Sequence, residues 1–182
     1  MVTIKEQKFK IIKNFLTKEE IELGKKYILM KHRLNITEFD YKQNNNIDTG
    51  FYRDPFFEAF LLNKKDIMEK ETNLKLLPTY SFCRVYTYAS ELERHKDRPS
   101  CEISVTVMLG GDGTEWPLYM DDTIPLNLEP GDAAIYLGCD LYHYRKPFTG
   151  DWHAQAFLHY VDKDGPNVEY VHDKKQPLYY LD

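Results

Sequence analysis

The first apolar run of the chain is followed directly by a helix-start signal. Residues 9–16 are rich in apolar side chains and are typical of a short strand. Thr17 can cap the helix that follows, and Glu20 can return a hydrogen bond to the Thr17 backbone, as in a capping box. The pattern therefore predicts a strand over 9–16 and a helix over about 18–31.

A second helix is predicted after a polar run. Residues 44–49 are polar and indicate a loop. Asp54 can act as an N-cap and Pro55 fits the first turn of a helix, which then extends over about 56–71. The apolar residues expected on the buried face of this helix are Phe56, Phe57, Phe60, Leu61 and Ile67.

After Pro78 the pattern changes to short runs rich in β-branched and aromatic residues, separated by turn signals. Residues 110–113, Gly-Gly-Asp-Gly, fit a hairpin connection. Residues 129–132, Glu-Pro-Gly-Asp, fit a turn that leads directly into the next strand. The predicted strands are Tyr80 to Tyr88, Ile103 to Leu109, Pro117 to Met120, Ala133 to Leu137 and His153 to Val161.

Helices followed by many strands favour a mainly β fold, a sandwich or barrel supported by N-terminal helices. We find no internal repeat and no linker long enough to divide domains. One domain is therefore expected over 1–182, with helical support over about 1–78, a strand-rich core over about 79–162 and a tail over 163–182. The tail is expected either to cover a sheet edge or to fold over the active site.

Composition fits a compact domain, since 42% of the 182 residues are hydrophobic and no low-complexity tract is present. The formal net charge is −5 and no basic stripe indicates nucleic acid or anionic lipid, so a peptide, protein or small molecule is the expected partner. No run has the length of a signal peptide or membrane span, which predicts a cytoplasmic protein. The cysteines, expected to be reduced and buried, are Cys83, Cys101 and Cys139.

Two histidines and one aspartate are the candidate metal ligands. Residues two apart in an extended segment face the same side, so His95 and Asp97 can converge on one ion. His143 must then arrive from another strand. Two imidazoles and one carboxylate form the ligand set of non-haem Fe(II) oxygenases, which hold the ion on one face and leave open positions.

These residues belong to an ordered series of motifs. The series is Arg84-Val85-Tyr86-Thr87-Tyr88, then His95-Lys96-Asp97, then Gly131-Asp132-Ala133-Ala134-Ile135-Tyr136, then His143 with Pro147 four positions later. With this series, residues 9–162 resemble the Fe(II)/2-oxoglutarate-dependent oxygenases, specifically the small prolyl-4-hydroxylase-like branch. The resemblance implies a double-stranded β-helix (jelly-roll) core.

The resemblance also implies a function. His95, Asp97 and His143 would hold Fe(II), 2-oxoglutarate would be the cosubstrate, and ascorbate would be a further cofactor. The implied enzyme is a dioxygenase that hydroxylates a prolyl residue in a peptide or protein.

The anchor for the distal carboxylate of 2-oxoglutarate departs from the family pattern. That branch carries Arg or Lys about ten positions after the distal histidine, where this chain has His153. His153 could bind the carboxylate when protonated, and Arg145 and Arg84 are alternative sources of charge. Tyr86 and Tyr88 share a strand face with Arg84, and the resemblance places Tyr88 against the cosubstrate. The remaining histidines, expected to be structural or solvent-facing, are His32, His159 and His172.

Three alternatives stay open. The substrate could be a free amino acid or another side chain, such as that of lysine. The missing Arg or Lys after His143 favours a jelly-roll binding module without oxygenase activity. A cupin-like enzyme with another divalent metal is the third reading.

Overall fold

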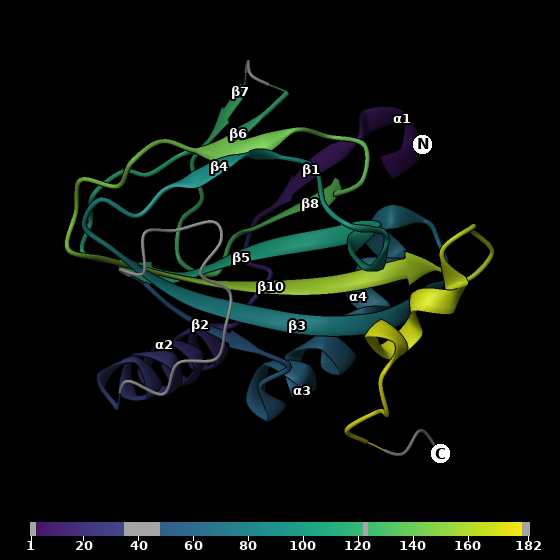
Figure 1. The fold of residues 1–182 in the computed structure, drawn as a ribbon, viewed down its shortest axis with the longest axis horizontal. Coiled ribbons are helices and arrows are strands. Elements are labelled where there is room, and N and C mark those ends of the chain that lie inside the picture. Colours follow the sequence, from purple (N-terminus) through teal and green to yellow (C-terminus); the bar gives the residue numbers. More distant parts are fainter. Residues whose placement is uncertain (1–2, 35–47, 122–123, 180–182) are drawn as a thin grey trace.

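Two antiparallel sheets face each other in the computed structural model, which describes residues 3–34, 48–121 and 124–179 (Figure 1). The larger sheet has the order β1-β8-β5-β10-β3-β2 and the smaller β4-β9-β6-β7. The expected mainly β fold with N-terminal helices is confirmed. The strands of the larger sheet are β1 (Phe9–Ile12), β2 (Thr49–Tyr52), β3 (Leu76–Thr87), β5 (Ile103–Gly111), β8 (Ala133–Leu137) and β10 (Trp152–Asp162).

Three helices cover the outer face of the larger sheet, while the smaller sheet lies over its inner face (Figure 1). A four-residue helix, α1 (Ile4–Gln7), precedes β1, and two 3-10 segments are η1 (Pro99–Cys101) and η2 (Val168–Lys174). The covering helices are α2 (Lys18–Arg33), α3 (Pro55–Asn63) and α4 (Lys65–Thr72). The strands of the smaller sheet are β4 (Leu92–His95), β6 (Leu118–Met120), β7 (Ile124–Leu126) and β9 (His143–Arg145).

The central strands of the larger sheet are buried on both faces, and their two faces differ in chemistry. Cys83 and Val85 of β3 belong to the main hydrophobic core with residues of the covering helices, such as Phe57 and Leu61. Because side chains alternate along a strand, the residues between them point to the other sheet. That inner face carries polar and aromatic side chains: Arg84, Tyr86, Ser104, Thr106, His153, Gln155, Phe157 and His159.

The predicted helix starts are confirmed. Thr17 and Glu20 form a reciprocal capping box at α2, and Asp54 accepts a hydrogen bond from the backbone of Phe56 with proline in the first turn of α3. The expected single helix over 56–71 is instead two helices that meet at Lys64.

The buried side chains of α3 and α4 differ from the predicted set at one position. Phe57 and Leu61 are fully enclosed, and Phe56 and Phe60 pack against the core, as predicted. Ile67 is 38% exposed and its neighbour Met68 is fully buried, so the expectation for Ile67 is wrong. At 3.6 residues per turn, Met68 falls on the buried face of Phe57 and Leu61, whereas Ile67 falls on the partly buried side with Phe56 and Phe60.

The strand predictions are confirmed at their centres and differ at their ends. Ala133–Leu137 is reproduced residue for residue, whereas β1 ends at Ile12 and β3 begins at Leu76 and ends at Thr87. The turn before β8 is confirmed, because Asp132 N donates to the Glu129 carbonyl at 2.8 Å. The N-terminal region also contributes β1 and β2 to the larger sheet, in addition to its helices.

The hairpin predicted at 110–113 is wrong. Gly110 and Gly111 continue β5, which pairs with β8 and β10, while the next strand, β6, pairs with β7 and β9 in the other sheet. Residues 112–117 therefore connect the two sheets. The loop expected at 44–49 lies outside the described residues except for Asp48 and Thr49, and Thr49 begins β2.

All three cysteines are free, with Cys83 and Cys101 buried and Cys139 partly exposed. Within the described residues, no helix combines the length and apolar character needed to cross a membrane.

Candidate metal centre

His95 and His143 are paired across two strands of the smaller sheet. β4 and β9 run antiparallel in a register that places His95 opposite His143. Their ring centroids lie 4.3 Å apart. Strand pairing thus brings together two imidazoles that are 48 positions apart in the sequence.

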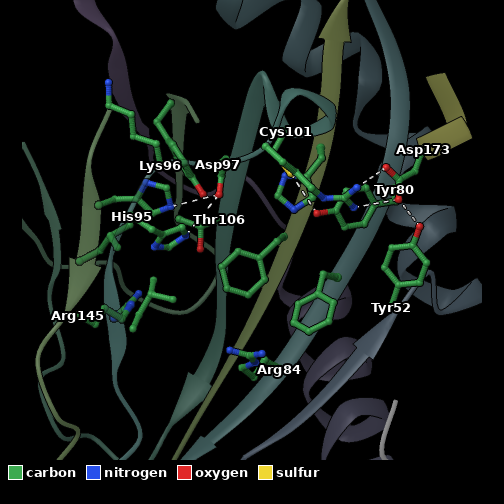
Figure 2. Close-up of a pocket in the computed structure, with 18 of the residues that line it drawn as sticks. Tyr52, Tyr80, Arg84, His95, Lys96, Asp97, Cys101, Thr106, Arg145 and Asp173 are labelled. Atoms are coloured by element: carbon green, nitrogen blue, oxygen red, sulfur yellow. Dashed lines mark hydrogen bonds and ion pairs between the residues drawn. The ribbon is translucent and has the colours of Figure 1, made fainter. Parts of the chain in front are cut away.

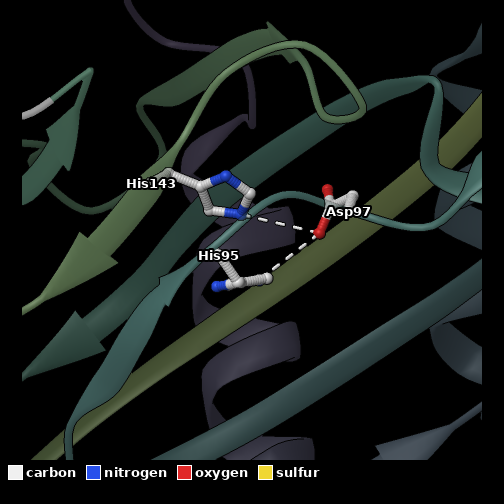
Figure 3. Close-up of side chains that lie close together, drawn as sticks. All are labelled: His95, Asp97 and His143. Carbon is white, nitrogen blue, oxygen red and sulfur yellow. Dashed lines mark ion pairs between the residues drawn. The ribbon is translucent and has the colours of Figure 1, made fainter.

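Asp97 completes the group from just beyond the end of β4 (Figure 3). Its Oδ1 atom is 3.5 Å from Nε2 of His95 and 3.5 Å from Nε2 of His143. Two ligands bound to one first-row metal at about 2.1 Å stand roughly 3.0–3.4 Å apart, so the three atoms need only small shifts to share an ion. Figure 3 shows the side chains turned toward one another.

Backbone carbonyls orient both imidazoles. Nδ1 of His95 lies 2.8 Å from the Glu93 carbonyl oxygen, and Nδ1 of His143 lies 3.2 Å from that of Leu141. A carbonyl can only accept, so Nδ1 carries the proton in each ring and Nε2 keeps a free lone pair. This is the arrangement in which metal-binding histidines are usually held, and the donor set therefore fits a divalent transition metal.

The charges of the group favour a bound cation. Burial opposes ionisation of Asp97, but its contacts with His143 and His95 outweigh burial and hold its pKa well below the usual range. For His95, burial lowers the pKa, while Asp97 and the Glu93 carbonyl raise it more. The carboxylate is therefore ionised at neutral pH and presents a negative charge to whatever lies between the imidazoles.

His159 lies next to this group, which sequence spacing did not indicate. Its Nδ1 atom is 2.8 Å from Ser104 Oγ, which in turn donates to Asp97 Oδ2 at 3.2 Å. Ligand atoms of Asp97, Cys101 and His159 also lie within 4.8 Å of one another. Burial lowers the pKa of His159 to about 4, so the ring is neutral. Through Ser104, His159 helps to position the Asp97 carboxylate, which is compatible with the expected structural role of His159.

A cavity of about 720 Å³ opens beside the three candidate ligands, between the two sheets (Figure 2). It is in the size range of small-molecule sites, about 300–1,000 Å³. Besides His95, Asp97 and His143, its lining includes Tyr52, Phe82, Arg84, Tyr86, Lys96, Arg98, Thr106, Tyr136, Arg145, Phe157, His159, Asp173 and Lys175.

Arg145 is a buried cation in this cavity. It is 5% exposed and lies two residues after His143, on the same face of β9. Burial lowers its pKa to about 10, so it stays charged at neutral pH. Its Nη1 donates to the Trp116 carbonyl, and no carboxylate among the described residues forms an ion pair with it. Burying an unpaired guanidinium is costly, so an anion bound beside Arg145 would stabilise it.

The predicted tyrosines behave differently from each other. Tyr86 is fully buried, lines the cavity and packs edge-on against Trp116 with centroids 4.7 Å apart. Tyr88 follows the last residue of β3 and is 67% exposed, so the structure does not bring it to the cavity. The strand ends before the expected alternation reaches position 88.

His153 is also outside the cavity that contains the candidate ligands. It lines a separate space of about 220 Å³, which Arg145 also borders. Its Nε2 lies 2.8 Å from Gln155 Oε1, and its Nδ1 is buried without a hydrogen-bond partner. Burial, and then the charge of Arg145, lower the pKa of His153 to about 3. The ring is neutral at physiological pH and provides no charge for an anion.

The C-terminal segment forms part of the cavity wall. Asp173 accepts two hydrogen bonds from Arg98, at 2.7 and 2.9 Å, and another from the hydroxyl of Tyr52. Asp173 and Lys175 both line the cavity. The tail was expected either to cover a sheet edge or to fold over the site, and its described part borders the candidate site. Sequence spacing gave no signal for this contact, because it joins residues 75 and 121 positions apart.

Thr106 and Tyr136 are further lining residues that sequence reasoning did not single out for a role. Tyr136 packs against His143 with ring centroids 4.9 Å apart, and Thr106 accepts a hydrogen bond from Gln155. Strand alternation could have identified both residues as inward-facing on β5 and β8, once the face of each strand that points to the other sheet was known.

Comparison with solved structures identifies the fold. A prolyl-4-hydroxylase from Pseudomonas putida matches with a TM-score of 0.71 at 14% identity, over 87% of this chain and 95% of that chain. A Trichoplax adhaerens prolyl hydroxylase in complex with a hypoxia-inducible-factor peptide fragment matches with a TM-score of 0.67 at 15% identity, over 88% and 86%. A non-haem alpha-ketoglutarate-dependent carbocyclase from nogalamycin biosynthesis gives 0.71 at 12% identity, over 88% and 82%.

Neither a family model nor a curated protein matches the sequence. The solved structures show that the chain has the jelly-roll fold of the 2-oxoglutarate oxygenases, as found in prolyl hydroxylases. The resemblance seen in the sequence is thus confirmed at the level of the fold. Because the same fold also occurs in a carbocyclase, it does not specify the reaction.

Proposed function

We propose that the protein is an Fe(II)- and 2-oxoglutarate-dependent dioxygenase that hydroxylates a prolyl residue in a peptide or protein. One observation carries the proposal: a buried arginine without a carboxylate partner, Arg145, shares a cavity with a ready-made group of two imidazoles and one carboxylate. A metal group and a separate buried cation are what a 2-oxoacid with a distal carboxylate requires.

His95, Asp97 and His143 would hold the ferrous ion through Nε2, Oδ1 and Nε2. When bound, Fe(II) supplies the redox chemistry by which dioxygen and a 2-oxoacid oxidise a C–H bond. The balanced reaction converts substrate, 2-oxoglutarate and dioxygen to hydroxylated substrate, succinate and carbon dioxide. The protein's own part begins with the carbonyl contacts of Glu93 and Leu141, which keep both imidazoles oriented before the ion arrives.

Arg145 would bind the distal carboxylate of 2-oxoglutarate. A guanidinium forms charge-assisted, often bidentate, hydrogen bonds with a carboxylate, and burial strengthens them by excluding water. The Tyr86 hydroxyl lies in the same cavity and can add a further hydrogen bond. In this proposal the cation that the family pattern expects near position 153 is supplied from β9 instead. His153 then supports the site as a neutral residue packed beside Tyr86 and Trp116.

The prolyl substrate is the finer part of the proposal. It is supported by the fold shared with two prolyl hydroxylases and by a cavity large enough for a small ring beside the cosubstrate. Ascorbate and a cytoplasmic location remain predictions from the sequence.

Turnover of 2-oxoglutarate tests the proposal. The protein should form succinate only when Fe(II) and dioxygen are present, and a prolyl peptide should increase the rate and gain one oxygen atom. His95→Ala and Arg145→Gln should each abolish succinate formation at cosubstrate concentrations that saturate the wild type. Tyr88→Phe is the matched control, because Tyr88 lies outside the cavity and should be replaceable without loss.

The binding-module reading predicts a different result. A jelly roll without a cosubstrate site would give no heat when the anaerobic Fe(II) protein is titrated with 2-oxoglutarate. A hydroxylase of a free amino acid or of a lysine side chain would turn over 2-oxoglutarate but would leave prolyl peptides unmodified.

A further inference from the structure

A second buried arginine lines the same cavity, and the cosubstrate does not account for it. Arg84 lies on the inward face of β3 and is 6% exposed. Arg84 and Arg145 enter the cavity from different strands, β3 and β9 (Figure 2). The 2-oxoacid end of 2-oxoglutarate would face the metal group, which leaves its distal carboxylate for a cation. In the proposed function Arg145 binds that carboxylate.

The protein provides Arg84 with only a weak counter-charge. Its ion pair is with Asp48, whose Oδ2 atom is 4.0 Å from Nε, the far limit of such a contact. Burial raises the pKa of Asp48, although the charge of Arg84 opposes this. Among the described residues, no other carboxylate forms an ion pair or a hydrogen bond with the Arg84 guanidinium.

Aromatic rings hold the Arg84 side chain. The guanidinium carbon lies 5.1 Å from the centroid of the Phe82 ring and 5.5 Å from that of Tyr86. Stacking of this kind orients the planar group and leaves its edge available for a bidentate partner. Phe157, whose ring centroid is 6.2 Å from that of Phe82, extends the apolar surface beside it. Together these residues provide an apolar surface with one oriented cation.

The charge balance of the cavity favours an anion even after the cosubstrate is bound. Among the described residues, its lining has five Lys and Arg side chains and two carboxylates, although the whole chain has a net charge of −5. One carboxylate, Asp97, belongs to the metal group, and the other, Asp173, is paired with Arg98. A ferrous ion, Asp97, 2-oxoglutarate and Arg145 together are neutral. The charges of Arg84, Lys96 and Lys175 remain on the lining, and Asp48, 4.0 Å from Arg84, is the counter-charge of Arg84.

We infer that Arg84 binds a carboxylate of the prime substrate, which is therefore an acid bound with its apolar part against Phe82 and Phe157. The carboxylate has two possible sources: the α-carboxylate of a free amino acid, or an acidic side chain next to the target residue in a peptide. This inference rests on the part of the proposed function that concerns Fe(II) and 2-oxoglutarate, and a free amino acid as the source would replace its prolyl peptide. It gives the two arginines different tasks, Arg145 for the cosubstrate and Arg84 for the substrate.

Binding to the complex of the protein with Mn(II) and N-oxalylglycine tests the inference without requiring turnover. Titration calorimetry compares matched pairs of acid and amide: the common free amino acids with their amides, and a prolyl-aspartyl peptide with its prolyl-asparaginyl counterpart. At least one acid should bind about 10- to 100-fold more tightly than its amide, the range expected for a charged hydrogen-bonded partner. The pair that shows this preference identifies the source of the carboxylate.

Variants separate this inference from the proposed function. Arg84→Gln should bring acid and amide to equal affinity while leaving the affinity for N-oxalylglycine unchanged, and Arg84→Lys should keep part of the preference. Arg145→Gln should weaken N-oxalylglycine instead. Failure of the wild type to bind N-oxalylglycine would overturn both proposals. Three results would overturn only the role of Arg84, provided that the wild type binds N-oxalylglycine. The wild type could show no preference for any acid, or Arg84→Gln could keep the preference. Arg84→Gln could also lower the affinity for N-oxalylglycine as Arg145→Gln does.

Discussion

Gly138 lies directly against the carboxylate of Asp97. A Cβ atom at position 138 would overlap both Asp97 Oδ2 and the carbonyl oxygen of Cys101. The Gly138 carbonyl also accepts a hydrogen bond from the Asp97 backbone at 2.8 Å. The turn after β8 therefore holds Asp97 in position from two sides, and it does so only while residue 138 has no side chain.

Replacing Gly138 with alanine should displace the Asp97 carboxylate. We expect Mn(II) affinity to fall by about 10- to 100-fold, the usual range for a disturbed outer contact of a metal site. The free energy of unfolding should fall by about 1–3 kcal/mol because of overpacking. Gly24→Ala in α2 is the control, since its Cβ would meet Leu109 and Phe60 at ordinary contact distances of 3.4 and 3.6 Å. Calorimetric titration with Mn(II) makes the comparison, and equal affinities for the two variants would contradict this account of Asp97.

Arg145→Met should increase stability while removing cosubstrate binding. Exchanging a buried unpaired cation for an apolar side chain of similar length should raise the free energy of unfolding of the metal-free protein by about 1 kcal/mol or more. The melting-temperature increase that 2-oxoglutarate and Mn(II) produce in the wild type should disappear. Denaturant titrations and thermal shifts measure the two effects. A variant less stable than the wild type that still responds to 2-oxoglutarate would show that Arg145 is a structural residue.

His153 should make folding stability depend on pH. Its folded pKa is about 3, whereas an unfolded histidine titrates near 6.5. Between these values the unfolded chain binds a proton that the folded protein does not, so stability is lost as pH falls below about 6.5. At pH 5 the loss from this residue is about 2 kcal/mol relative to pH 7.5. His153→Gln should remove that part of the pH dependence in denaturant titrations at the two pH values, and an unchanged difference would exclude this origin.

Local patterns were sufficient for the elements that have strong end signals. Thr17 and Asp54 indicated the starts of α2 and α3 because caps act within one turn of the chain. β4 and β9 are four and three residues long, and such short strands form by pairing with each other rather than from their own composition. The assignment of 110–113 failed for a related reason, since a glycine-rich turn does not show which sheet the next strand joins.

The candidate metal group could be predicted from sequence because residue type and order carry it, as with His95, Asp97 and His143. The surroundings of the group could not. His153 occupies the expected sequence position for a charged anchor, but its neutral state follows from burial beside Arg145, Trp116 and Phe148. The contacts of Asp173 with Arg98 and Tyr52 depend on tertiary packing alone.

Two adjacent residues of α4 give a direct stability test, because the helical period places one in the core and the other toward its edge. Met68 is fully buried and Ile67 is 38% exposed. Met68→Ala should lower the free energy of unfolding by about 2–5 kcal/mol, because it leaves a cavity in the core. Ile67→Ala should change it by about 1 kcal/mol or less. Equal losses, measured by denaturant titration, would contradict the placement of Met68 rather than Ile67 in the core.

A crystal structure with Mn(II) and N-oxalylglycine tests the central claim most directly. The account predicts one anomalous manganese peak within bonding distance of His95 Nε2, Asp97 Oδ1 and His143 Nε2, with the distal carboxylate of N-oxalylglycine hydrogen-bonded to Arg145. Manganese bound by Asp97, Cys101 and His159 instead, or N-oxalylglycine bound away from Arg145, would contradict it.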